Sequence, residues 1–351
     1  KFQSPDKQKI IVFDNQTIDD LKNILENYDY FLLKSRIEKI DCIYFSPNIL
    51  KNFIKNFEGN IMTAYFVALI KEINPKIVLT HIDNSFKFFD ITKKLHKEFC
   101  FIAIQNAYRI DIGEYKHRYE KKLTESDYRK KFYIPNFFCF GKFEIDLYKK
   151  HKLNVKKFFI VGSLRLANFF YYLKKNKINL KKKYDICLIS ESFVGREDIF
   201  GIPDFEKRAA LLVKFTLKFC MKHKMKLVYP LKYGKQKFNI SYFKKYLNKD
   251  EYKYLIKNSA DRKNTFSSYT AMNQSKVTVA VISTLLSEHL STGEKILACN
   301  LTPTKLWDFP IDGVCFIKNC TYEQFEKRLF NIYSMPKRKY LLKINTGKNY
   351  L

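Results

Sequence analysis

The segment at residues 276–299 constrains the fold of this chain more than any other. Two apolar runs flank a helical pattern, which predicts a buried strand, a sharp turn, a helix, a stop and a second buried strand. Strands that alternate with helices are typical of a parallel, doubly wound sheet. The parts are, in order, Val277–Ile282, Ser283 with Thr284, Leu285–Ser291, Gly293 and Lys295–Cys299.

Ser283 and Thr284 stand where the predicted strand turns into the helix. The first N–H groups of a helix have no partner within it and the helix dipole makes this end positive, so the junction can hold an anion. Glu288 lies one turn further on, within reach of a neighbouring sugar hydroxyl. Phosphate plus ribose is therefore the expected ligand. Two simpler explanations stay open: the hydroxyl pair is only an N-cap, and Glu288 is only a solvated helix residue.

The same alternation recurs along all 351 residues, a length that suffices for two domains. We expect an α/β protein with two Rossmann-like domains that face each other across a cleft. The N-terminal domain is predicted over residues 1–173 and the C-terminal one over 184–335, with a basic link at 174–183 and a basic tail at 336–351. The predicted strands of the first half are Ile10–Phe13, Cys42–Phe45, Lys76–Thr80, Phe101–Ile104, Asn136–Phe140 and Lys157–Val161, and a strand at Tyr184–Ser190 and a helix at Pro203–His223 open the second.

The composition excludes some classes of function. The formal net charge is +30, but its lysines are spread over the whole chain, whereas a nucleic-acid binder concentrates arginine and aromatic residues in one patch. We therefore do not expect nucleic acid as a partner. Peripheral contact with an anionic membrane is the better explanation of the positive charge. The eight cysteines lack CxxC spacing, which indicates free thiols in a reducing cytoplasm. We predict neither a metal nor another cofactor, and no membrane-spanning helix.

Ligands of open α/β sheets bind outside the carboxyl ends of the strands, and this rule selects candidate residues. Lys232, after the predicted strand that ends near Tyr229, can neutralise a donor phosphate. Arg109 can hold a carboxylate or phosphate with its fork of donors, unless it forms only a surface ion pair. The other candidates at strand ends are Asp14, His81, Asp83, Asn84, Gln105 and Asn106 in the first half, and Ser190, Glu191, Ser192, Arg196, Ser283, Thr284 and Glu288 in the second.

Asp83 carries the mechanistic hypothesis. In Thr80-His-Ile-Asp-Asn84, His81 and Asp83 fall on one side of an extended segment, because side chains there alternate. A carboxylate beside an imidazole can act as a general base or as a nucleophile at an anomeric carbon. The alternative is that Asp83 or Asn84 caps the helix that begins near Ser85.

Four segments of the chain share a common pattern with other sequences: Ile77–Asn84, Phe101–Arg109, Phe159–Arg165 and Val277–Cys299. Together they resemble a family of bacterial surface-carbohydrate (capsule or O-antigen) biosynthesis proteins, which is similar to GT-B glycosyltransferases and lies near the Kdo transferase groups. The sequence departs from the family pattern at Ala107, where glycine is usual, at Leu286-Ser287, where Gly-Tyr is usual, and at Ile282, where an aspartate often precedes Ser-Thr.

This resemblance implies a metal-independent GT-B glycosyltransferase, cytoplasmic or peripheral on the inner face of the membrane. It would transfer a sugar from a nucleotide-activated donor, with CMP-Kdo favoured, to a surface polysaccharide or glycolipid. Ser283, Thr284 and Glu288 would bind the donor with help from Lys232, Ser190 and Ser192. Asp83 would be catalytic with His81, and Arg109, Asn106, Asp14 and Arg165 would bind the acceptor or an anion.

Two other classes of function stay open. The first is a non-catalytic carbohydrate- or membrane-associated assembly protein that retains the GT-B fold, which hydrolysis of the donor without acceptor would distinguish from an enzyme. The second is a nucleic-acid binder, suggested by charge alone, for which RNA or DNA binding at physiological salt would be the evidence.

Overall fold

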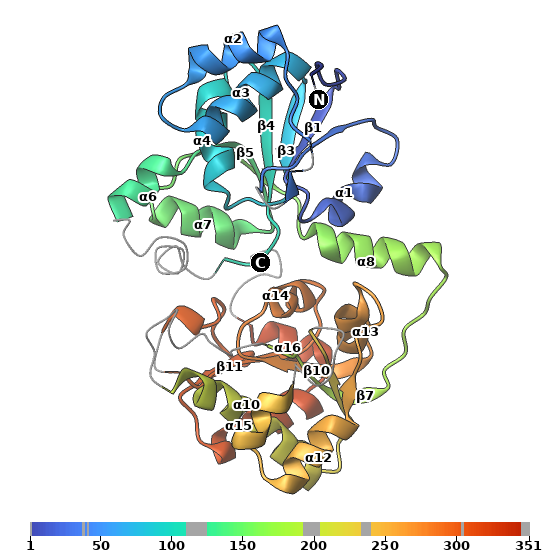
Figure 1. Cartoon of the computed structure of the whole chain (residues 1–351). Helices are drawn as coiled ribbons and strands as arrows, with labels where there is room; N and C mark the ends of the chain where they lie inside the picture. The colour runs from blue at the N-terminus through green and yellow to red at the C-terminus, as the bar shows by residue number, and fades with distance from the viewer. Residues whose placement is uncertain are drawn as a thin grey trace. The chain divides into compact units, whose positions relative to one another are not determined.

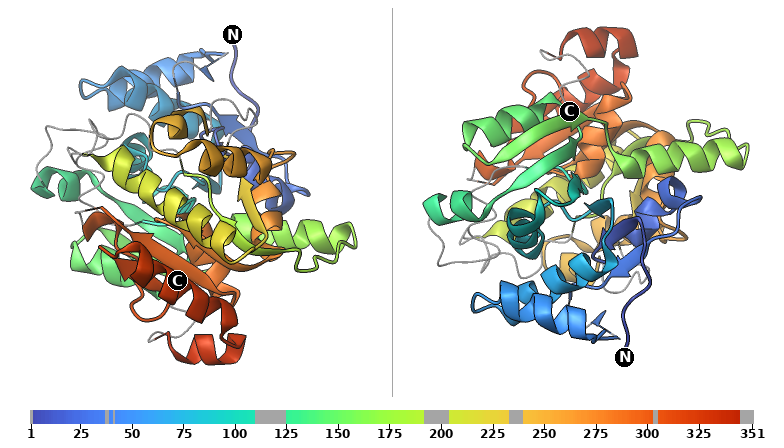
Figure 2. Two further views of the ribbon diagram at one scale, coloured as in Figure 1. Left: turned by 90° about the horizontal axis from the view of Figure 1, so that it is seen from below. Right: turned by 90° about the horizontal axis from the view of Figure 1, so that it is seen from above.

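A computed structural model describes residues 2–36, 39–40, 42–109, 125–191, 204–232, 240–302 and 305–344. The chain divides into two compact units, and it passes from one to the other three times. Unit 1 consists of Lys1–Ala107 and Lys122–Asn168, and unit 2 of Tyr108–Lys121 and Phe169–Leu351. In each unit, helices pack around one sheet (Figures 1 and 2).

Unit 1 is built on a six-stranded parallel sheet with the order β2-β1-β3-β4-β5-β6. Its central strands β1 and β3 are apolar and almost wholly buried, as expected when helices cover a parallel sheet. The strands are β1 (Ile10–Phe13), β2 (Phe31–Leu33), β3 (Ile77–Thr80), β4 (Cys100–Ile104), β5 (Ile134–Cys139) and β6 (Val155–Ile160). The helices are α1 (Ile18–Leu25), α2 (Pro47–Asn56), α3 (Ile61–Ile73), α4 (Phe86–Leu95), α6 (Glu125–Lys131), α7 (Lys142–Lys150) and the start of α8 (Leu164–Lys175).

Unit 2 has a second six-stranded parallel sheet, with the order β12-β11-β10-β7-β8-β9. Counted from its own first strand, this is the 3-2-1-4-5-6 order of a dinucleotide-binding fold. The strands are β7 (Tyr184–Leu188), β8 (Leu227–Pro230), β9 (Ser259–Ala260), β10 (Ser275–Ala280), β11 (Ile296–Asn300) and β12 (Phe316–Lys318). The α-helices are α10 (Phe205–Lys222), α12 (Lys249–Lys257), α13 (Ser267–Asn273), α14 (Thr284–Ser291), α15 (Tyr322–Ser334) and α16 (Lys337–Leu342), with 3-10 turns η2 (Ser241–Lys245) and η3 (Lys305–Trp307).

The strand–helix–strand segment that opened the sequence argument is present as β10, α14 and β11. Ser283 is the N-cap of α14, and its Oγ accepts a hydrogen bond from the N–H of Leu285 at 3.3 Å. Gly293 follows the helix with a φ of +79°, a left-handed conformation that costs glycine little. The N-cap and the glycine stop thus begin and end α14 close to the predicted positions.

One predicted strand is wrong. Cys42–Phe45 forms no strand, and β2 is instead Phe31–Leu33, which pairs with Ile11–Phe13 of β1. Ile43 and Phe45 are exposed, so their apolar character does not reflect burial in a sheet. A short apolar run does not reveal which residues find a neighbouring strand, and this explains the error.

The last described residues pack onto unit 2. Tyr340 of α16 is buried, and its hydroxyl donates to the carbonyl of Ile296 at 2.9 Å while accepting from the N–H of the same residue at 3.0 Å. These bonds tie α16 to the first residue of β11. Across the described ranges, no helix is long and apolar enough to cross a bilayer.

Candidate functional site

The strand orders define one switch point in each sheet, where the chain turns from one side of the sheet to the other. In unit 1 it lies between β1 and β3, and in unit 2 between β7 and β10. Crevices outside the carboxyl ends of strands at such points are where α/β sheets bind ligands. The predicted site residues cluster at these two edges: Asp14, His81 and Asp83 in unit 1, and Ser190, Ser283 and Thr284 in unit 2.

The edge of unit 2 has a well-defined loop after β10. The carboxylate of Glu191, which follows β7, accepts hydrogen bonds from the N–H groups of Val281 at 2.9 Å and Ile282 at 3.3 Å. Thr284 Oγ1 accepts from the N–H of Tyr108 at 3.0 Å, and Tyr108 belongs to the same unit. Glu191 therefore holds the ends of β7 and β10 together and fixes the backbone that leads into α14.

Glu288 is not on an exposed helix face. Its side chain is buried at 3% exposure, and its Oε2 accepts a hydrogen bond from the hydroxyl of Tyr269, on α13, at 2.8 Å. This excludes the simpler interpretation of Glu288 as a solvated helix residue. A buried carboxylate is costly without polar partners, so a specific pairing of this kind is expected.

Ser190, at the end of β7, is buried and bonds the hydroxyl of Tyr229 on β8. Burial raises the pKa of Tyr229 far above its usual range, although the bond to Ser190 opposes the shift. Tyr229 is thus a neutral partner in the pH range of the cell. Lys232 is exposed and follows β8, and its carbonyl accepts from Arg262 at 3.1 Å. Ser192 and Arg196 lie outside the described residues.

At the edge of unit 1, the segment after β3 is a turn and not the extended segment that the sequence suggested. The N–H of Ile82 bonds Oγ1 of Thr80 at 3.0 Å, and residues 83–84 form a turn. The premise that His81 and Asp83 share one side of a strand is therefore wrong. Asp83 is fully buried, with Oδ1 accepting from the N–H of Asn106 at 3.2 Å.

Asp83 is also not the cap of α4. Ser85 holds that position, and its Oγ accepts from the N–H of Phe88 at 3.4 Å. The capping explanation for a buried carboxylate here is thereby removed. What the structure establishes for Asp83 is its burial at the switch point and its bond to the loop after β4.

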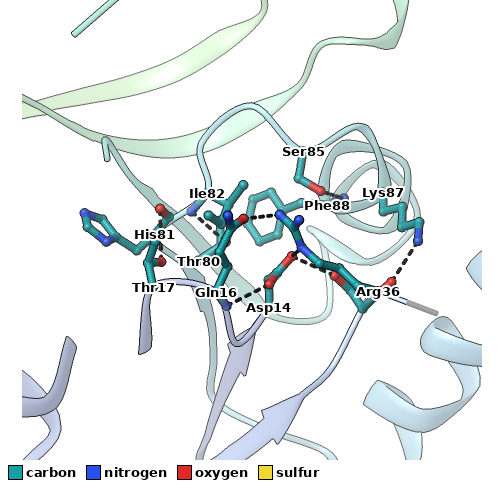
Figure 3. Close-up of polar contacts among 11 residues, drawn as sticks. Asp14, Gln16, Thr17, Arg36, Thr80, His81, Ile82, Ser85, Lys87 and Phe88 are labelled. Atoms are coloured by element: carbon teal, nitrogen blue, oxygen red, sulfur yellow. Dashed lines mark hydrogen bonds and ion pairs between the residues drawn. The ribbon is translucent and has the colours of Figure 1, made fainter. Parts of the chain in front are cut away.

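Asp14 is the centre of a polar network at the end of β1 (Figure 3). Its Oδ1 accepts from the N–H of Gln16 at 2.9 Å, and its Oδ2 pairs with Nε of Arg36 at 3.0 Å and with Oγ of Ser35 at 3.1 Å. Its φ of +77° is left-handed, a conformation that aspartate tolerates better than most residues. Lys87 bonds the carbonyl of Ser35 at 2.7 Å and adds a second positive charge.

His81 points away from the Asp14–Arg36 pair (Figure 3) and meets a different carboxylate. Its Nδ1 lies 3.3 Å from Oδ2 of Asp20, on α1, and the same oxygen accepts from Nε of Arg165 at 2.8 Å. Burial alone would raise the pKa of Asp20, but the contacts with His81 and Arg165 outweigh burial and hold it below its usual value of 3.8. Asp20 is therefore ionised near neutral pH and orients both partners.

Arg109 is not at the surface, since it is only 6% exposed, and this excludes a surface ion pair. Gln105 ties the loop after β4 to the end of β5 and the start of α7. Its amide donates to Glu144 at 2.8 Å and to the carbonyl of Ala107 at 3.0 Å, and its oxygen accepts from the N–H of Phe140 at 2.8 Å. Glu144, buried at the start of α7, also accepts from the N–H of Gly141 at 3.1 Å.

Sequence reasoning missed most of the groups that position the candidates. It did not select Asp20, Glu144 or Tyr269, because each bonds a residue distant in the chain. Only Glu191 carried a local signal, since it lies between Ser190 and Ser192 after a predicted strand. Within the described ranges, no three His, Cys, Asp or Glu side chains gather in a way that could hold a metal ion.

Solved structures with the same fold include two UDP-GlcNAc 2-epimerases and a wall teichoic acid polymerase. The UDP-GlcNAc 2-epimerase of Neisseria meningitidis bound to UDP-GlcNAc matches with a TM-score of 0.57 and 14% identity, over 97% of this chain and 95% of that one. The Methanocaldococcus jannaschii UDP-GlcNAc 2-epimerase in complex with UDP-GlcNAc and UDP matches with a TM-score of 0.54 and 12% identity, over 97% and 95%. The wall teichoic acid polymerase TagF matches with a TM-score of 0.52 and 10% identity, over 96% and 83%.

At these identities the likeness establishes the fold alone, which is GT-B with two Rossmann-like domains. No curated protein sequence matches the chain. A family model described as "putative O-antigen biosynthesis protein" matches residues 102–310, more than half of the sequence. The surface-carbohydrate resemblance seen in the sequence is thereby confirmed, and the chain belongs to this O-antigen biosynthesis family.

Proposed function

We propose that this protein is a glycosyltransferase that moves a sugar from a nucleotide-activated donor to a bacterial surface polysaccharide or glycolipid, without a metal ion. The observation that carries the proposal is the edge of unit 2. There Ser190, Ser283 and Thr284 line the switch point between β7 and β10, the start of α14 follows, and the buried Glu288 lies one turn inside. This combination suits a phosphate beside a ribose.

In this proposal each polar group has a definite task. The N–H groups at the start of α14, with Ser283 and Thr284, bind the donor phosphate, and Glu288 accepts from ribose hydroxyls. Ser190, Ser192 and Lys232 assist. Stabilisation of the leaving phosphate by the helix end and by these donors takes the place of a bound cation.

Residues of unit 1, together with Arg109 of unit 2, supply the catalytic carboxylate and the acceptor contacts. Asp83 acts as general base or nucleophile, supported by His81, and Arg109 and Asn106 contact the acceptor. Asp14 and Arg165 are proposed to contact the acceptor or an anion as well. In the structure, Asp14 is bonded to Arg36 and Arg165 is bonded to Asp20. That the two edges face each other, and that the domains run over 1–173 and 184–335, also stay predictions.

The nucleotide is the most accessible part of the proposal to test. CMP is our first choice on the strength of the sequence resemblance to Kdo-type transferases. The epimerase structures contain UDP-GlcNAc, which makes the uridine nucleotide the direct competitor. A thermal-shift series with CMP, UDP, GDP, dTDP and their sugars compares the candidates, because a ligand at about 100 times its Kd stabilises the folded state by about 2.7 kcal/mol.

We expect the largest rise in Tm with CMP and its sugars. If no nucleotide changes the Tm at millimolar concentration, the donor site is wrong. A nucleotide sugar that binds but is neither hydrolysed nor transferred would favour the alternative, a non-catalytic assembly protein that retains the fold.

A further inference from the structure

Helix α2 presents apolar side chains to the outside of unit 1. Leu50, Ile54 and Phe57 have exposed fractions of 41%, 66% and 47%, and we call these three residues the α2 stripe. Their spacing of four and three residues puts them on one face of the helix or directly after its last turn. Ile49, by contrast, is buried, so the helix uses another face to attach to the unit.

The position of α2 leaves this stripe accessible. The helix packs against α3 and lies on the outside of unit 1 (Figures 1 and 2). Ile61, the first residue of α3, is exposed as well, at 63%. Single exposed apolar residues are ordinary on protein surfaces, but a row of them along one helix marks an interaction surface.

The charges beside the stripe are all positive along the helix. Lys51 and Lys55 directly follow Leu50 and Ile54 and are exposed, and Pro47–Asn56 contains no acidic residue. The nearest acid in sequence, Glu58, pairs with Lys94 at 2.6 Å. A short helix with one apolar face and flanking lysines is the pattern of segments that lie in the interface of an anionic bilayer.

We propose that the α2 stripe with Lys51 and Lys55 is a docking surface for an anionic phospholipid bilayer. The helix lies flat, its three apolar side chains enter the boundary between headgroups and acyl chains, and the lysines contact lipid phosphates. This goes beyond the proposed transferase activity, and beyond the membrane contact expected from the net charge, by naming the face that binds, and it does not depend on that activity.

A second copy of the chain is the less suitable occupant. A two-fold dimer through this helix would place the same patch on both sides of the contact and bring Lys51 and Lys55 of the two copies together. The repulsion between like charges would oppose that contact, whereas anionic lipid would relieve it.

Vesicle co-sedimentation of the full chain tests the surface. Vesicles of phosphatidylcholine alone are compared with vesicles that also contain phosphatidylglycerol. The parent protein should bind the anionic vesicles, and the variant Leu50→Ser/Ile54→Ser/Phe57→Ser should bind them roughly tenfold more weakly or less. Lys51→Gln/Lys55→Gln should also lower binding by about tenfold or more, and added salt should reduce binding of the parent.

The matched control removes three exposed apolar side chains elsewhere. Met221, Ile256 and Phe330, in unit 2, have exposed fractions of 40%, 38% and 45%, and their replacement by serine should leave vesicle binding unchanged. Equal binding by the stripe variant and the parent would overturn the proposal. So would a dimer, detected by light scattering, that the stripe substitutions dissociate in a protein that binds no vesicles. The rise in Tm caused by nucleotide should be the same in the stripe variant and in the parent. Loss of vesicle binding can then be distinguished from failure of the donor site.

Discussion

The two sheet edges of this protein are alike in topology and different in chemistry. The edge of unit 1 contains ionic groups in contact: Asp14 pairs with Arg36, and Asp20 lies between His81 and Arg165. The edge of unit 2 contains hydroxyl groups and a helix start, and its acids Glu191 and Glu288 bind neutral N–H and O–H donors. In the function that we propose, the edge of unit 1 would carry the chemistry, and the edge of unit 2 would hold a phosphate and a sugar ring.

Among the substitutions that test this comparison, Asp83→Asn should have the largest effect, which is on turnover. It keeps the size of the buried side chain and an oxygen that can accept from Asn106, so the fold and nucleotide binding should survive. If Asp83 acts directly on the reacting bond, turnover should fall by about 10²–10⁴-fold. Steady-state transfer kinetics and a nucleotide titration measure the two properties.

The matched control is Asp14→Asn, which changes a carboxylate at the same edge that already pairs with Arg36. Because Asp14 is proposed to contact the acceptor, its substitution should raise the KM for acceptor, whereas kcat at saturating acceptor should stay near that of the parent. Near-normal transfer by Asp83→Asn, with loss in Asp14→Asn, would move the catalytic carboxylate to Asp14.

At the edge of unit 2, Glu288→Gln should weaken binding of the nucleotide by about 1–3 kcal/mol, because ribose hydroxyls lose a charged acceptor. Tyr269→Phe removes the hydroxyl that bonds Glu288 and leaves the carboxylate, so it should keep most of the affinity. Calorimetric titration with CMP compares the two variants, and thermal melts check that the buried site still folds. Equal affinity in Glu288→Gln and the parent would leave Glu288 a purely structural role.

The smallest expected effect is on the free energy of unfolding and comes from the ion pairs of unit 1. Asp20→Asn should lower the free energy of unfolding by about 1 kcal/mol near neutral pH, since Arg165 is partly exposed and its pairing is screened. The folded-state pKa of Asp20 is below 3.8, so its contribution is present above that pH and is lost as pH falls through the folded-state value. Urea unfolding at several pH values should therefore show a constant difference from the parent above about pH 5, and a shrinking one below pH 4.

Asp19→Asn is the control on the same helix. The Asp19 side chain is 79% exposed and pairs only with the exposed Lys22 among the contacts described, so the free energy of unfolding should barely change. An equal loss in both variants would show that the pairing of Asp20 with His81 and Arg165 has no special role.

The sequence was a good guide to what depends on neighbouring residues. The strands around Ile10, Ile77, Phe101 and Val277 and the N-cap at Ser283 follow from apolar runs and local capping chemistry. Strand order does not, because periodicity carries no information on which strands become neighbours. The same limit explains the site: the contact of His81 with Asp20 joins residues 61 positions apart, and that of Asp20 with Arg165 joins residues 145 apart. Likewise, the hydrogen-bond partner of the buried Glu288 is Tyr269, on another helix.

The path of the chain between the units limits how the protein can be dissected. Tyr108 directly follows Ala107, the last residue of the first segment of unit 1, yet it is part of unit 2 and its N–H bonds Thr284. A fragment cut at Asn168 would carry this residue away, and the complementary fragment would lack a hydrogen-bond donor at the start of α14. To produce unit 2 on its own, the segment that contains Tyr108 has to be added to the fragment. A fragment that simply starts at Phe169 lacks the N–H group that bonds Thr284 at the start of α14.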